Sequence, residues 1–261
     1  MSSDDARAEP DSFVGVAPTT WGFDNARNLP EVHASTWQQE IGLELEETDG
    51  DAPRARGSIE FPDGYELTLL LEDPISDLVE MVPTSKEPYT PSDTILIKEH
   101  SATWRFVAPD GAELRKDAAK KFARLCSTFV EAGSAGIFMP GIAALHSPRF
   151  IKKITMDLSH PQAITNLCVN CWDEDDWMAT RGLTSFGLPE LETPIEQGAN
   201  ASYFRLMDIA ADMINRGSAY PVGGNLNVGP ESLEVEEGRQ GPADQQIPIA
   251  GTFGVLTVRP S

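Results

Sequence analysis

The chain contains little lysine and few basic residues of any kind. Only seven of its 20 basic residues are lysines, and they stand against 41 acidic residues, which makes the formal net charge −21 at pH 7. Such a charge repels nucleic acid and anionic membranes, so the sequence predicts neither as a binding partner. Two interpretations of the acidity stay open: a surface adapted to a salty habitat, or a surface that attracts a basic protein partner.

Cysteines and long apolar runs are also scarce. Three cysteines, an odd number, argue against a disulfide framework, and we expect free thiols in a reducing cytoplasm. The amino terminus is polar and acidic and lacks the apolar stretch of a secretory signal. The longest apolar stretch, Ala135–Leu145, is short and is interrupted by Gly136, Pro140 and Gly141, so no membrane-spanning helix is predicted.

Familiar catalytic and cofactor-binding motifs are missing from the sequence. It contains no Gly-x-Ser-x-Gly elbow, no phosphate-binding Gly-x-x-x-x-Gly-Lys loop, no dinucleotide-binding fingerprint and no His-Glu-x-x-His motif. The four histidines are scattered, and we interpret His100 and His146 as hydrogen-bonded structural residues. We therefore predict no cofactor and do not identify an enzyme, although catalytic groups can assemble from distant positions.

Residues 1–57 differ in composition from the rest of the chain. They contain 12 acidic residues against four arginines, and the run Glu46–Pro53 is typical of a linker. Trp21, Phe23 and Trp37 are costly to leave in water, which predicts that parts of the segment pack on the domain or on a partner. We interpret residues 1–57 as an acidic, partly docked N-terminal extension.

Residues 58–261 are predicted to form a single α+β domain, a layered mixed sheet with helices packed on it. Strands and helices do not alternate strictly, which argues against a doubly wound parallel sheet. Gly133 and Gly217 lie just beyond two apolar-periodic segments, and Ser147 precedes a third, as helix capping predicts. The predicted strands are 65–71, 94–107, 135–139, 163–172 and 253–258. The predicted helices are 75–81, 112–131, 148–158 and 203–215.

Two short clusters invite a redox or metal interpretation, and we predict neither. The pair Cys168 and Cys171 is the only one of its kind, whereas structural zinc needs four ligands, and residues three apart on a strand point to opposite faces. Within the acidic run Asp173–Asp176, only Asp173 and Asp175 have the alternating spacing of a calcium loop, and the loop's glycine is missing. We interpret this run as a solvated turn between two strands.

The segment Thr180–Glu192 reads Thr-Arg-Gly-Leu-Thr-Ser-Phe-Gly-Leu-Pro-Glu-Leu-Glu and carries the clearest local pattern. We interpret it as a strand–turn–strand unit. Gly182 permits close backbone packing within a strand, Phe186 enters the core, and Gly187 supplies a positive φ.

Charged residues flank this turn. We expect Arg181 to pair with Glu190 or Glu192 across the two strands, an interaction that stabilises little if it is exposed.

The same segment, followed by an amphipathic helix, resembles the domain-of-unknown-function family 4261. Other matches occur in the expected order: Pro74-Ile75 after a strand, His100-Ser-Ala, and Ala135-Gly-Ile-Phe after a long helix, with a glycine-rich tail and a terminal strand. The resemblance covers roughly residues 60–258. It implies a bacterial α+β domain without known activity, cofactor or catalytic residues, so no functional residue is carried over.

These observations predict a non-catalytic binding or interaction module. A specific form of the hypothesis is a module that binds and neutralises a basic protein partner. The alternative is a metal-dependent or carboxylate-based hydrolase with a site near the Asp173–Asp176 loop and Glu190. A third possibility is a housekeeping domain whose acidity reflects a salty habitat. The candidate binding residues lie in or beside the Thr180–Glu192 segment. They are Asp173, Asp175, Asp176, Arg181, Glu190 and Glu192.

Overall fold

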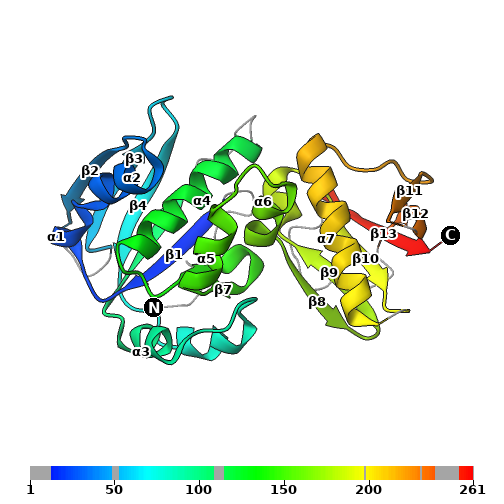
Figure 1. Ribbon diagram of the computed structural model, residues 1–261, viewed down its shortest axis with the longest axis horizontal. Coiled ribbons are helices and arrows are strands. Elements are labelled where there is room, and N and C mark those ends of the chain that lie inside the picture. Colours follow the sequence, from blue (N-terminus) through cyan, green and yellow to red (C-terminus); the bar gives the residue numbers. More distant parts are fainter. Residues whose placement is uncertain are drawn as a thin grey trace. The chain divides into compact units, whose positions relative to one another are not determined.

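The computed structural model describes residues 13–48, 53–108, 115–196, 198–229, 231–238 and 253–260. The chain divides into two compact units: an N-terminal unit of residues 12–157 and a C-terminal unit that contains residues 158–261. Each unit combines a sheet with packed helices, which confirms the predicted α+β class (Figure 1). Among the described residues, no helix combines the length and apolar content that crossing a membrane requires.

A seven-stranded sheet forms the framework of the N-terminal unit. Its strand order is β2-β3-β4-β5-β1-β6-β7, and each neighbouring pair is antiparallel. The first four strands are β1 (Val14–Thr19), β2 (Gly42–Glu47), β3 (Ala55–Glu60) and β4 (Glu66–Glu72). The others are β5 (Ala102–Val107), β6 (Ile137–Met139) and β7 (Ala144–His146).

The long helix α4 lies along this sheet (Figure 1), and its aromatic side chains are buried in the core. The rings of Phe122 and Phe129 each lie 5.1 Å from the ring of Phe106 on β5. Gly15 on β1 allows this packing, because a Cβ atom there would lie 2.4 Å from the Phe106 ring. The helical segments of the unit are α1 (Phe23–Ala26), α2 (Leu29–Trp37), η1 (Leu78–Thr84), α3 (Pro91–Glu99), α4 (Arg115–Glu131), η2 (Pro140–Ile142) and α5 (Pro148–Thr155).

Strand β1 corrects the predicted N-terminal extension. It lies inside the sheet, between β5 and β6, and all six of its residues are buried. The described part of residues 1–57 thus supplies β1, β2, the start of β3 and two helices to the N-terminal unit. Along the chain, the division between the two compact units falls between residues 157 and 158, not between 57 and 58. Composition does not reveal the burial of β1, because that burial comes from pairing with β5 and β6, which lie much later in the chain.

Helix α3 replaces the first part of the β structure predicted for residues 94–107. The Thr90 hydroxyl accepts a hydrogen bond from the Asp93 amide, and the Asp93 carboxylate accepts one from the Thr90 amide. Pro91 occupies the first helical turn. This capping box outweighs the β preference of Ile95 and Ile97. The strand β5 begins only after this helix.

A six-stranded mixed sheet forms the framework of the C-terminal unit. Its order is β11-β12-β13-β10-β9-β8, in which β10 and β13 are parallel and the other pairs are antiparallel. The strands are β8 (Asn170–Glu174), β9 (Trp177–Arg181), β10 (Glu190–Pro194), β11 (Asn225–Val228), β12 (Glu231–Glu237) and β13 (Val255–Pro260). The predicted mixed sheet is therefore present in this unit.

Helix α7 (Ala199–Arg216) packs on this sheet and on helix α6 (Pro161–Cys168), and a 3-10 turn, η3 (Leu183–Phe186), connects β9 to β10. Gly217 ends α7 in the left-handed conformation, as predicted. The strand predicted for residues 163–172 is wrong, because α6 occupies its first part. Cys168 is buried at the end of α6, and Cys171 is half-buried on β8.

Candidate functional site

The acidic run between β8 and β9 forms the tip of a hairpin. Glu174 and Trp177 are paired across the two strands, so Asp175 and Asp176 make a two-residue turn. Both have positive φ, 49° and 63°, a conformation that aspartate tolerates better than most residues. Asp173, Asp175 and Asp176 are exposed, which agrees with the predicted solvated turn.

Glu190 lies in a different environment, fully buried on β10. Its carboxylate accepts hydrogen bonds from the Thr180 hydroxyl at 2.7 Å, the Gly182 amide at 2.8 Å and the Thr184 amide at 3.3 Å. The two amides belong to the start of η3, so Glu190 satisfies backbone donors that this short helix leaves open. Gly182 has a φ of 125° and begins η3, rather than packing within a strand as predicted.

Burial dominates the ionisation of Glu190. Removal from water raises its pKa to about 7, although the hydrogen bonds from Thr180, Gly182 and Thr184 favour the charged form. Burial lowers the pKa of the half-buried Arg181, and the negative charge of Glu190 opposes this change. The charge of Glu190 therefore acts on Arg181, and the pairing of the two side chains across the strands stays a prediction.

Glu192 is also fully buried. It lies opposite Thr257 on the parallel strand β13, and the Thr257 hydroxyl donates to its carboxylate at 2.6 Å. A neighbouring buried hydroxyl, that of Thr193, donates to the Val258 carbonyl at 2.7 Å. These hydrogen bonds join β10 to β13, so Glu192 stabilises the pairing of two strands inside the sheet.

The structure therefore divides the six predicted residues. Three aspartates lie on an exposed hairpin tip, and Glu190 and Glu192 lie inside the sheet with the half-buried Arg181 beside Glu190. Within the described ranges, no group of three or more His, Cys, Asp or Glu side chains is placed to hold a metal ion. Glu190 binds backbone amides and Glu192 binds the Thr257 hydroxyl, and neither residue has exposed surface that a ligand can touch.

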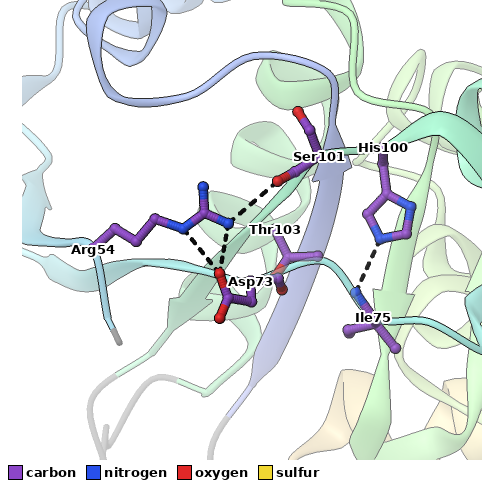
Figure 2. A network of polar contacts seen from close by, with 6 residues as sticks. All are labelled: Arg54, Asp73, Ile75, His100, Ser101 and Thr103. Atoms are coloured by element: carbon purple, nitrogen blue, oxygen red, sulfur yellow. Dashed lines mark hydrogen bonds and ion pairs between the residues drawn. The ribbon is translucent and has the colours of Figure 1, made fainter. Parts of the chain in front are cut away.

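A second polar network lies in the N-terminal unit (Figure 2). Arg54 donates to the Asp73 carboxylate at 2.6 Å and to the Ser101 carbonyl at 3.3 Å, while the Thr103 hydroxyl donates to the Asp73 carbonyl at 2.8 Å. Both ionic partners are largely exposed, so their attraction contributes little to stability. The network joins the end of β4 to the start of β5.

His100 lies beside this network and contacts the Ile75 amide (Figure 2), and its two hydrogen bonds define its tautomer. The Ile75 amide donates to Nε2 at 3.0 Å, so this nitrogen is unprotonated, and Nδ1 lies 2.5 Å from the Ile97 carbonyl and carries the hydrogen. This confirms the structural, hydrogen-bonded role predicted for His100, although the residue ends a helix and does not lie on a strand.

Sequence reasoning missed a third place, the outer strand of the N-terminal sheet. β2 is the last strand in the sheet order and pairs with β3 alone among the described strands. Its half-buried Leu43 and Leu45 line a pocket of about 260 Å³ together with Arg27 and Pro30. The signal in the sequence is the alternation Leu-Glu-Leu-Glu at residues 43–46, and β2 includes Glu46 and Glu47 at the start of the predicted linker.

Acidic side chains outnumber basic ones beside this pocket. Glu44, Glu46 and Glu47 are exposed on β2 and Glu60 is exposed on the adjacent β3, whereas Arg27 lines the pocket and the exposed Arg56 on β3 lies opposite Glu46. We call β2 together with Arg27 and Pro30 the β2 edge.

Comparisons of the chain with protein-family models, with curated proteins and with solved structures found no match. The resemblance to the domain-of-unknown-function family 4261 therefore stays a prediction.

Proposed function

We propose that this protein is a non-catalytic binding module whose partner is a basic protein. The observation that carries the proposal is the formal charge of −21, together with the exposure of acidic side chains in both units. Glu44 and Glu46 belong to the N-terminal unit, and Asp173 and Asp175 to the C-terminal unit. Carboxylates in water attract a cationic partner over about 10 Å at 0.1 M salt, which accelerates association.

The placement of the carboxylates favours binding over hydrolysis. A hydrolase needs an acid or base that reaches the substrate. Glu190, whose pKa of about 7 would suit such a role, is fully buried and already accepts three hydrogen bonds. We therefore assign Glu190 to the fold and the exposed carboxylates to recognition.

The test is affinity capture with the intact chain at low and high salt. We expect the immobilised protein to retain a discrete basic protein at low ionic strength, and the retained amount to fall as salt is added. A carrier protein of similar negative charge is the control for nonspecific attraction. The proposal fails if no basic protein is retained at low salt or if the control retains the same proteins.

Salt adaptation predicts a different result. If the acidity only suits a salty habitat, the melting temperature rises steeply with salt and no basic protein is retained. If our proposal holds, a basic partner raises the melting temperature at low salt, because a ligand that binds only the native state stabilises it.

A further inference from the structure

The β2 edge has the properties of a peptide-binding strand. Its outer side has no partner strand among the described residues, and backbone donors and acceptors of an outer strand are a template for another chain. We infer that β2 binds an extended segment of the partner, in which basic and apolar residues alternate, as an additional strand of the N-terminal sheet. This inference rests on the proposed function and names the binding site and the chemistry of the bound segment.

The two faces of β2 differ in a way that defines this alternation. Leu43 and Leu45 are half-buried and face the pocket with Pro30, whereas Glu44 and Glu46, which point to the opposite face, are exposed. A strand added beside β2 presents its own side chains to the same two faces. Apolar residues of the segment then extend the Leu43–Leu45 surface, and lysines or arginines lie beside the glutamates.

The size of the pocket suits side chains better than a separate small molecule. Its volume of about 260 Å³ is below the range of roughly 300–1,000 Å³ that is typical of small-molecule sites. Arg27, whose guanidinium lies 5.1 Å from the centre of the Phe23 ring, borders the pocket and is exposed. Main-chain hydrogen bonds supply affinity in this mode, and such pockets select the side chains.

The charge of the β2 edge disfavours a second copy of the chain as its occupant. In an antiparallel pair of two β2 strands, Glu44, Glu46 and Glu47 of each copy would approach the same residues of the other, and like charges on adjacent strands repel. Acidic residues on an outer strand also protect it from aggregation. If the glutamates only protect β2 from aggregation, β2 binds no peptide, and the following experiment distinguishes this case from peptide binding.

The experiment measures binding of a fluorescent probe, the peptide Lys-Val-Lys-Val-Lys-Val-Lys, to the full chain at low salt. We expect this probe to bind at least about tenfold more tightly than the scrambled peptide Lys-Lys-Val-Val-Val-Lys-Lys, which has the same charge and composition. N-methylation of alternate residues blocks one hydrogen-bonding edge of the probe. One of the two alternately methylated probes should therefore lose most of the affinity.

Paired variants of the protein locate the site. The double substitution Glu44→Lys and Glu46→Lys should weaken probe binding by about tenfold or more, whereas Asp173→Lys with Glu196→Lys, an equal change of charge at exposed sites in the C-terminal unit, should have a much smaller effect. Leu43→Ser should also weaken binding, because it removes apolar surface from the pocket. Circular dichroism and the melting temperature check that each variant is folded.

The outcomes separate the two proposals. Equal binding of the ordered, scrambled and methylated peptides, or equal effects of the two double substitutions, overturns the β2 site but leaves a basic partner in place. Absence of binding by every cationic peptide, together with no basic protein in the capture experiment, overturns both. Slower amide hydrogen exchange in Leu43–Glu47 upon addition of the ordered probe would support the added strand directly.

Discussion

His33 provides the sharpest test of the energetics, because an ionisable side chain is fully buried in the N-terminal unit. The Thr128 hydroxyl donates to the Arg124 carbonyl at 3.0 Å, so His33 Nδ1 must donate to the Thr128 oxygen, 2.7 Å away. Nε2 is then unprotonated, and it has no hydrogen-bond partner among the residues that the structure describes. Burial, assisted by the positive charge of Arg124, lowers the pKa of His33 from 6.5 to about 4.

This lowered pKa makes the N-terminal unit sensitive to acid. Below pH 6.5 the unfolded chain binds a proton at His33, whereas the folded chain does so only near pH 4, so falling pH favours unfolding. The difference corresponds to about 3 kcal/mol of stability lost between pH 6.5 and 4, of which about 2 kcal/mol is lost between pH 7 and 5.

The substitution His33→Asn removes the titrating group and can keep a donor to Thr128. We expect urea unfolding at pH 7 and pH 5 to show a decrease in stability that is smaller by about 2 kcal/mol in the variant than in the wild type. Because two compact units can unfold separately, hydrogen exchange of α4 peptides assigns the affected transition. An unchanged difference between pH 7 and 5 in the variant would refute the neutral, buried state of His33.

Three further predictions concern other parts of the chain. Burial raises the pKa of Glu190 from 4.5 to about 7, so its contribution to the free energy of unfolding is fully present below pH 4.5, and about 3 kcal/mol is lost as pH rises through 7. Glu190→Gln should abolish this pH dependence in urea unfolding, and an unchanged pH profile in the variant would contradict the prediction. Ser147→Ala removes the side-chain acceptor of the Phe150 amide at the start of α5, and we expect urea unfolding to show a loss of about 1 kcal/mol in stability. Ser147→Thr is the control that keeps the cap, and equal stability of both variants would refute the capping role. Magnesium, calcium or zinc ions should leave the melting temperature unchanged, and a clear rise would favour the hydrolase hypothesis over a binding module.

Local signals predicted several elements correctly. Ser147 and Pro148 start α5, Gly217 ends α7, and Gly187 adopts a φ of 69° after η3. In each case the residue type satisfies a backbone requirement within a few positions of itself, which a sequence displays directly. The capping box of Thr90 and Asp93 is equally local, but the β-branched residues that follow it favour a strand, which is why the sequence predicted β structure there.

The candidate site was predicted less well, because some of its residues are buried and the others are exposed. The sequence placed Glu190 and Asp176 together near one turn, and the structure puts the first inside the protein and the second on a hairpin tip. Both are acidic and lie close in the chain, so composition cannot distinguish them. The difference comes from the strands β9, β10 and β13, which surround one carboxylate and leave the other in water.

The sequence by itself determined the α+β class, the acidity, the start of α5 and the ends of α4 and α7, because these depend on composition or on neighbouring residues. Only the tertiary structure decided that β1 lies inside a sheet, that Glu190 and Glu192 are buried, and that β2 forms an edge with a pocket beside it. The physical reason is that burial and strand order arise from pairing between distant segments. Val14 and Val107 are partners across β1 and β5, a contact that no local pattern specifies.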